Sequence, residues 1–202
     1  MGSLHAFHHH PVMTAVWYAT YAVWVVPEIV LSRRLRSAND AQKADRGSKL
    51  AIYVTMFVGI FLGFLAAVSV PSLSVNAHWK TMFALGIAAW CAGIVLRLYS
   101  IHILGRFFTY DVAISSGQHV VEHGPYRWIR HPSYLGALVT MVGLGMTMTN
   151  WLAMFLPACF LAAGYVYRIH VEEQALVRGL GPAYSDYMQR TWRLIPYVFW
   201  RW

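Results

Sequence analysis

Charged residues and cysteines are scarce in this sequence. Only 12% of its 202 residues are Asp, Glu, Lys or Arg, whereas a soluble domain carries roughly 25%. Cys91 and Cys159 both lie inside apolar runs, which argues against a disulfide framework or a cysteine-bound metal. No signal-peptide pattern opens the chain, because the first lysine or arginine, Arg33, follows the first apolar run. Nor is a myristoyl anchor expected, since Ala6 stands where Ser or Thr is required.

Long apolar runs fill most of the chain, and 58% of all residues are hydrophobic. The last run, from Tyr134 to Tyr167, is uncharged for 34 residues, which suits two short spans joined at Asn150. We therefore predict an all-α integral membrane protein with about five transmembrane helices. The expected single domain covers 1–202, with spans near 12–31, 50–70, 79–104, 133–149 and 151–167. The glycines expected to let the last two spans approach closely are Gly136, Gly143, Gly145 and Gly164.

The positive charges predict how these spans are oriented. If five spans alternate in direction, fifteen of the sixteen Lys and Arg residues fall on one side and only Lys80 on the other. The positive-inside rule then places the N-terminus outside and the C-terminus in the cytosol. The membrane would be the inner or plasma membrane in a bacterium and the endoplasmic reticulum in a eukaryote. Topology thus accounts for the net charge of +8, and nucleic acid is not an expected partner.

The stretch from Gly124 to Tyr134, G-P-Y-R-W-I-R-H-P-S-Y, cannot be a spanning helix. Each of its two prolines lacks an N–H and disfavours helix in the residue before it, and its arginines would be costly in hydrocarbon. The stretch could be a basic cluster that only binds lipid headgroups, and His131 could be a structural histidine. Headgroup attraction needs no fixed backbone, however, so the prolines favour one wall of a binding site at the membrane surface.

A second water-facing segment, residues 168–190, follows the last apolar run. On a helix, Arg168 and Glu172 share a face, whereas Glu173 is rotated by about 100°. The first two could form an ordinary ion pair at a helix end. Their place where the last span meets the cytosol favours a functional site instead, because ionisable groups at that depth are site candidates.

The end of this segment and the two chain termini carry further patterns. After Gly181, a short amphipathic helix is expected to place Tyr184 and Tyr187 on one face. The closing W-R-L-I-P-Y-V-F-W-R-W suits the membrane interface. No metal site is predicted, since the histidines near the start have no carboxylate or cysteine nearby and suit a mobile tail. These histidines, which could hold a metal only weakly, are His5, His8, His9 and His10.

The motifs in this order resemble those of the isoprenylcysteine carboxyl methyltransferase family. The resemblance runs from about Leu104 to Pro196. It rests on G-P-Y-R-W-I-R-H-P-S-Y-L-G, an uncharged helical hairpin, R-x-x-x-E-E, and L-G-P-A-Y-x-x-Y followed by L-I-P. It implies a short, prokaryote-like member with its catalytic half at 104–196, acting as an S-adenosylmethionine-dependent carboxyl O-methyltransferase. The cytosolic cofactor pocket would be formed by the loop before the fourth span and the C-terminal helical extension.

The resemblance also implies an acceptor and roles for single residues. The acceptor would be a prenylated small molecule or a prenylated protein C-terminus, reached among membrane lipids. Arg168 aligns with the arginine that meets the substrate carboxylate. Gln118 stands where well-studied eukaryotic members have histidine, so it can hydrogen-bond an amino-acid head but carries no charge. The residues implied to bind the cofactor are Gln118, His119, Val120, Val121, Tyr126, His131, Pro132, Ser133, Tyr134 and Glu172.

The chemistry of a carboxylate acceptor agrees with these residues. A carboxylate is already anionic at pH 7, so no general base is needed, and Arg168 can bind it bidentately. Other readings stay open, because related membrane enzymes have similar C-terminal halves. These are methyl transfer to an amine, thiol or phospholipid headgroup, an NADPH-dependent reductase of the sterol-reductase type, and a membrane scaffold whose arginines hold headgroups.

Overall fold

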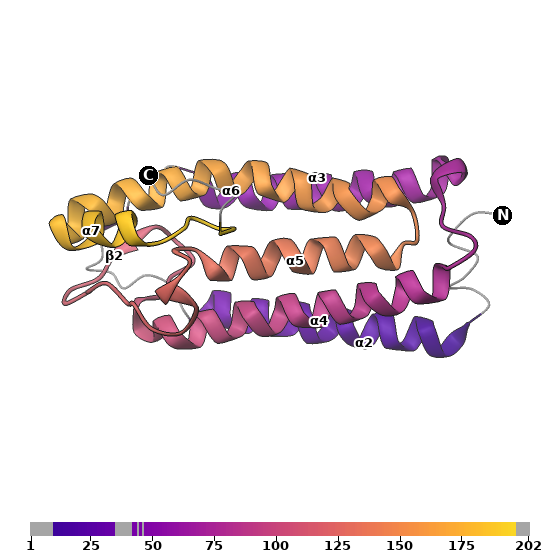
Figure 1. The fold of residues 1–202 in the computed structure, drawn as a ribbon, viewed down its shortest axis with the longest axis horizontal. Helices are drawn as coiled ribbons and strands as arrows, with labels where there is room; N and C mark the ends of the chain where they lie inside the picture. The colour runs from indigo at the N-terminus through magenta and orange to yellow at the C-terminus, as the bar shows by residue number, and fades with distance from the viewer. Residues whose placement is uncertain (1–9, 35–41, 44, 46, 197–202) are drawn as a thin grey trace.

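Five long helices lie along one axis and form the body of the molecule (Figure 1). The structure is a computed structural model that describes residues 10–34, 42–43, 45 and 47–196. The long helices are α2 (Pro11–Arg34), α3 (Ser48–Ser69), α4 (Trp79–Leu104), α5 (Pro132–Thr147) and α6 (Trp151–Leu180). The shorter elements are β1 (Gln42–Lys43), η1 (Pro71–Leu73), η2 (Gly105–Phe107), β2 (Ala113–Ile114), η3 (Gly124–Arg127) and α7 (Pro182–Arg190). The predicted histidine tail, apart from His10, and the closing aromatic run from residue 197 onward lie outside the described residues.

Four of the long helices are long and apolar enough to cross a membrane, namely α2, α3, α4 with η2, and α6. The fifth, α5, has 16 residues and is about 24 Å long at 1.5 Å per residue, short of a hydrocarbon core of roughly 30 Å. It packs against both α4 and α6, and most of its residues are buried by them. The predicted all-α integral membrane fold is confirmed, with four candidate spans by length within the described part of the chain and α5 enclosed between two of them.

The turn between α5 and α6 is built around Asn150, which is completely buried. Its side-chain oxygen accepts hydrogen bonds from the N–H groups of Leu152 at 3.0 Å and Ala153 at 3.2 Å, so it caps α6. Its amide nitrogen donates to the Val70 carbonyl at 3.0 Å, just beyond α3. The Asn150 side chain therefore caps α6 and links the end of α3 to the turn between α5 and α6.

The Gly124–Tyr134 stretch is not part of a spanning helix, as its prolines predicted. Gly124 has φ +59° and opens η3, and Pro132 occupies the first turn of α5, where a missing N–H costs nothing. Between these two helices the backbone pairs with the C-terminal segment. The Arg130 N–H donates to the Trp192 carbonyl at 2.7 Å, and the Trp192 N–H donates to the Trp128 carbonyl at 2.9 Å.

The glycines of the last apolar block serve contacts other than the one expected from the sequence. Gly145 alone faces the partner arm, where a Cβ would overlap the α6 backbone. Gly136 and Gly143 lie against α4, and Gly164 lies against α3. The prediction of a glycine-mediated contact between α5 and α6 is thus wrong for three of the four. The reason is that α5 is packed on two sides, so that Gly136 and Gly143 approach the backbone of α4 and not that of α6.

We expect Gly143→Ala to lower the thermal stability of the purified protein by several degrees. The new Cβ would lie 2.7 Å from the Gly86 carbonyl oxygen, and overpacking a tight core typically costs about 1–3 kcal/mol. Gly63→Ala is the control, because its Cβ first meets the Pro157 side chain at 3.1 Å, and its nearest backbone contact, the Ala153 carbonyl oxygen, is at 3.4 Å. Circular dichroism in detergent measures both variants. Equal shifts for the two would contradict a backbone contact between α4 and α5.

The polar segments gather at one end of the bundle, on the left in Figure 1, where α7 and β2 lie beside the end of α6. The segment between α2 and α3 joins this end through β1, which pairs antiparallel with β2. Gln42 is paired with Ile114 and Lys43 with Ala113. Segments that are far apart in the chain thereby enclose one polar region, and the residues singled out from the sequence lie in it.

Candidate active site

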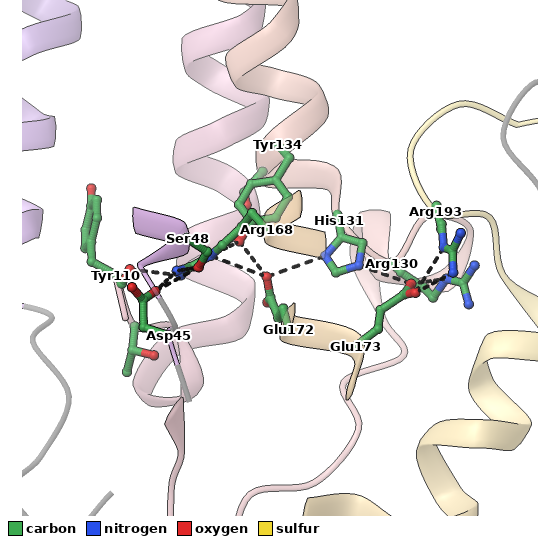
Figure 2. Close-up of polar contacts among 12 residues, drawn as sticks. Asp45, Ser48, Tyr110, Arg130, His131, Tyr134, Arg168, Glu172, Glu173 and Arg193 are labelled. Carbon is green, nitrogen blue, oxygen red and sulfur yellow. Dashed lines mark hydrogen bonds and ion pairs between the residues drawn. The ribbon is translucent and has the colours of Figure 1, made fainter. Parts of the chain in front are cut away.

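A row of charged and aromatic side chains crosses the polar end (Figure 2). The row begins at Asp45, just before α3, and then alternates between side chains of α6 and side chains at the start of α5, ending at Glu173 of α6. We call it the charged row, and its members are Asp45, Arg168, Tyr134, Glu172, His131 and Glu173.

Arg168 is buried, with 4% of its side chain exposed, and each guanidinium nitrogen has a protein acceptor. Its Nη1 forms an ion pair with Asp45 and donates to Ser48 Oγ at 2.9 Å. Its Nη2 donates to the Tyr110 carbonyl at 2.9 Å, and its Nε donates to Tyr134 Oη at 3.2 Å. The arginine therefore joins α3, α5, α6 and the loop after α4.

Tyr134 connects this arginine to Glu172. Its hydroxyl donates to Glu172 Oε2 at 2.5 Å while accepting from Arg168 Nε. The Tyr134 ring is stacked between those of His131, with centroids 5.4 Å apart, and Tyr165, at 4.4 Å. Glu172 Oε2 also lies 4.0 Å from Arg168 Nε and 3.9 Å from His131 Nδ1. Two segments that are separate in the sequence thus meet around one carboxylate, 27% of which is exposed.

Glu173 faces away from Arg168, as the helical spacing predicted, and only 5% of its side chain is exposed. Its carboxylate lies 3.3 Å from Arg130 Nε and 3.4 Å from His131 Nε2, and Arg193 Nη2 donates to it at 2.9 Å. These contacts join α6, the Gly124–Tyr134 stretch and the segment that follows α7, residues 191–196. The two neighbouring glutamates therefore differ in environment, since Glu172 faces open space and Glu173 is enclosed by cations.

An open cleft lies between the loop after α4 and the ends of α6 and α7, and its empty space, mouth included, is about 800 Å³. Leu176 and Leu180 of α6 give it an apolar wall, and Glu172 gives it a carboxylate. Pro132, implied by the resemblance to bind the cofactor, is fully buried and lies outside the lining. The other implied residues all line the cleft: Gln118, His119, Val120, Val121, Tyr126, His131, Ser133, Tyr134 and Glu172.

Two of these residues already use part of their hydrogen-bonding capacity within the protein. The Gln118 side-chain oxygen accepts from the Ser115 N–H at 2.9 Å, which leaves its NH₂ group as the donor available to a ligand. The Tyr126 hydroxyl donates to the Ser100 carbonyl at 3.3 Å, so its proton is already used within the protein.

A second hollow, whose empty space, mouth included, is about 2590 Å³, lies among α2, α3, α5 and α6. Its lining is mainly apolar and aromatic, and Arg168 lies at its polar end. The side chains that border both this apolar cavity and the open cleft are Phe108, Thr109 and Tyr134. Arg168 borders only the apolar cavity. Tyr134 therefore stands where a polar cleft and an apolar cavity adjoin.

A further ion pair, which the sequence interpretation overlooked, lines the apolar cavity. Arg97 of α4 pairs with Glu28 of α2, and Arg97 Nη2 donates to Glu28 Oε2 at 3.0 Å. The Tyr110 hydroxyl donates to the same oxygen at 2.8 Å. The signal was present in the sequence, because Glu28 and Arg97 each interrupt an apolar run, and ionisable residues in such runs usually pair with one another.

Asp45 is the other residue that the sequence interpretation missed. It lies among the basic residues of the first loop, and the sequence interpretation gave it no role. Burial raises the pKa of the Asp45 carboxyl, but hydrogen bonds from Ser48 and the Lys49 N–H, together with the charge of Arg168, outweigh this effect and lower that pKa below its ordinary value. Asp45 is therefore ionised at neutral pH and neutralises Arg168.

The tyrosines of α7 close the far side of the cleft. Tyr184 and Tyr187 are both buried and lie on one face, as predicted. Burial is the main cause that raises the pKa of each phenol, and the carboxylate of Glu173 adds to it at Tyr184. Both phenols therefore stay neutral, and the Tyr187 hydroxyl donates to the Tyr126 carbonyl at 2.6 Å.

The fold and the site define a helical integral membrane protein with a polar cleft at one end that adjoins an apolar cavity. Residues 84–178 match the sequence model of the isoprenylcysteine carboxyl methyltransferase (ICMT) family. The chain also superposes on a solved structure of the eukaryotic intramembrane Ras methyltransferase ICMT. The TM-score is 0.57 at 30% identity, over 72% of this chain and 52% of that one. These matches confirm the resemblance to the isoprenylcysteine carboxyl methyltransferase family that the motifs of the chain show.

Curated relatives carry matching names. The protein-S-isoprenylcysteine O-methyltransferase of Tribolium castaneum is 34% identical over 67% of this chain and 48% of its own length. Protein-S-isoprenylcysteine O-methyltransferase B of Arabidopsis thaliana is 29% identical over 72% of this chain and 73% of its own length. The chain thus spans about half the length of the insect enzyme and of the solved ICMT chain.

Proposed function

We propose that the chain transfers a methyl group from S-adenosylmethionine to the carboxylate of a lipophilic acceptor, most simply a prenylated cysteine or a similar small molecule. The observation that carries the proposal is the meeting of the open cleft and the apolar cavity at Tyr134, beside Arg168. A water-soluble donor and a lipid-soluble acceptor need two such approaches to one point. The relatives named as isoprenylcysteine O-methyltransferases support the acceptor class.

The side chains of the open cleft suit S-adenosylmethionine. The Glu172 carboxylate can pair with the amino-acid ammonium or bond to a ribose hydroxyl, and the Gln118 NH₂ group can donate to a carboxylate. Leu176, Leu180 and Val121 offer an apolar wall for an adenine ring. When bound, this cofactor supplies a methyl group on a positively charged sulfur.

The protein's own part in the reaction is to bind, align and exclude water. Tyr134 is held in place by ring stacking and by hydrogen bonds to Arg168 and Glu172, so it fixes the boundary between the two hollows. Arg168 can hold an acceptor carboxylate with charge-assisted hydrogen bonds at this boundary. Holding two reactants in contact accounts for a large part of many enzymatic rate enhancements, and a carboxylate needs no base to become a nucleophile.

The apolar cavity suits the acceptor's tail. Along α5 its lining extends from Tyr134 to Met148, a length of about 21 Å at 1.5 Å per residue. Trp17 and Trp24 of α2 and Phe57 and Phe61 of α3 contribute aromatic surface. Each methylene buried there would contribute about 0.8 kcal/mol. We further propose that the polar end faces the cytosol, as the positive-inside rule predicts.

Titration of the purified protein tests the cofactor assignment. S-adenosylmethionine should bind and NADPH should not, and a panel of prenylated thiol acids should then yield methyl esters. Binding of NADPH alone would overturn the proposal in favour of a reductase. Lipid binding that tracks anionic headgroups and salt, with no preference for S-adenosylmethionine over adenosine, would favour a scaffold.

The dependence of the rate on pH should separate a carboxylate acceptor from an amine. Asp45 has a lowered pKa, so its contact with Arg168 is complete at neutral pH and is lost only as pH falls through that lowered value. From about pH 6 to about pH 8, turnover of a prenylated acid should therefore stay nearly constant. Turnover of a prenylated amine should instead rise by up to about tenfold per pH unit, because the amine must lose a proton before it can react. A preferred amine acceptor would contradict the carboxylate assignment.

A further inference from the structure

Arg168 already holds a carboxylate in this structure, and that carboxylate belongs to the chain itself. Asp45 Oδ1 contacts Arg168 Nη1 and accepts from Ser48 Oγ at 2.9 Å. Its Oδ2 accepts from the Lys49 N–H at 3.2 Å. Asp45 lies 123 residues from Arg168 in the sequence, and Figure 2 shows the two side chains facing each other at one end of the charged row.

An acceptor carboxylate cannot form two hydrogen bonds with Arg168 unless a present partner leaves. Nη2 is used by the Tyr110 carbonyl, and Nε by Tyr134. Tyr134 of α5 is fixed by stacking on Tyr165 of α6, and Tyr110 contributes its backbone carbonyl. Asp45 is the partner with a free route to water, since 22% of its side chain is exposed and it precedes α3 rather than lying within it.

We propose that Asp45 occupies the place of the acceptor's carboxylate on Arg168, and that the acceptor binds by exchange with it. The inference rests on the proposed function, which assigns Arg168 to the acceptor. Exchange of one carboxylate for another keeps the buried guanidinium neutralised at each stage. The displaced Asp45 carboxylate is then hydrated, so neither it nor the Arg168 guanidinium is left buried without a partner.

The exchange also makes Asp45 a residue that determines specificity. A neutral lipid, such as an alcohol or an amide, offers Arg168 no charge and cannot displace Asp45. The methyl ester product is likewise neutral, because methylation removes the negative charge that displaced Asp45. Asp45 then pairs with Arg168 again and expels the ester. Acids are thus admitted, and esters are released.

Asp45→Asn tests the exchange, because it keeps the size of the side chain and removes its charge. We expect the KM for a prenylated thiol acid to fall about tenfold, and inhibition by its methyl ester to strengthen by a similar factor. Asp45→Glu, which restores the carboxylate, should return both values to within about threefold of the wild type. Glu122→Gln is the matched control, since it removes one negative charge from an exposed ion pair with Arg190 and should change neither value.

Binding without turnover separates this inference from the proposed function. Equilibrium binding of the same thiol acid is measured in the wild type, in Asp45→Asn and in Arg168→Ala. If binding is insensitive to Arg168, the proposed acceptor site is wrong. If binding depends on Arg168 but Asp45→Asn weakens it or leaves it unchanged, only the exchange is wrong and Asp45 is a structural support. Asp45→Ser repeats the test should the asparagine variant lose its thermal transition, and tighter binding there sustains the exchange.

Discussion

Arg168→Ala should lower kcat/KM for a prenylated acid by about 100-fold or more while leaving S-adenosylmethionine binding within about twofold of the wild type. Two charge-assisted hydrogen bonds to the acceptor would be lost, each worth about 1.5–3 kcal/mol. The cofactor should be spared because Arg168 borders the apolar cavity and not the open cleft. Steady-state methylation and calorimetric titration with S-adenosylmethionine measure the two effects separately.

Arg168→Lys is the matched control for this variant. It keeps the positive charge and loses the planar fork that binds a carboxylate bidentately. We expect activity between that of the alanine variant and the wild type, mainly through a higher acceptor KM. Thermal unfolding of both variants should be measured as well, because Arg168 also forms hydrogen bonds with Ser48 and the Tyr110 carbonyl that stabilise the fold and that the substitutions would disturb. Weakened cofactor binding together with an unchanged acceptor KM would overturn the assignment.

Glu172→Gln should weaken S-adenosylmethionine binding by about 10- to 100-fold, with little change in thermal stability. Its carboxylate is partly exposed to the open cleft and is the anion that the cofactor's ammonium or ribose would meet. Loss of one or two charge-assisted bonds accounts for that range. His131→Ala should also weaken cofactor binding, because the His131 ring lines the cleft and orders Tyr134 by stacking.

Glu173→Gln is a control from the next residue of the same helix. Glu173 is buried among Arg130, His131 and Arg193, and removing one partner of a buried ion pair costs about 3–5 kcal/mol. This variant should lose thermal stability and keep its cofactor affinity per folded molecule. If the two glutamates show the same pattern, or the reverse one, then the division of roles between them is incorrect.

The class of protein and the segments that carry its chemistry could be predicted from the order of the amino acids alone. Apolar runs too long for a soluble core required a membrane, and the prolines of the Gly124–Tyr134 stretch excluded a span there. The order of motifs identified the family, which the comparisons confirm. The i,i+4 spacing correctly set Arg168 and Glu172 on one face and Glu173 on another. These features depend on local chain geometry, which sequence spacing encodes directly.

Which of these segments meet, and which other residues join them, depends on how the helices and loops pack in three dimensions. Asp45 reaches Arg168, and Glu28 reaches Arg97, across chain separations that no periodicity encodes. Gly136 and Gly143 of α5 lie against α4 rather than α6, because several apolar faces could pack against one another equally well by composition alone. The apolar cavity among α2, α3, α5 and α6 likewise exists only through their packing. Hydrophobic patterning fixes which residues avoid water, whereas shape and charge pairing in three dimensions fix their neighbours.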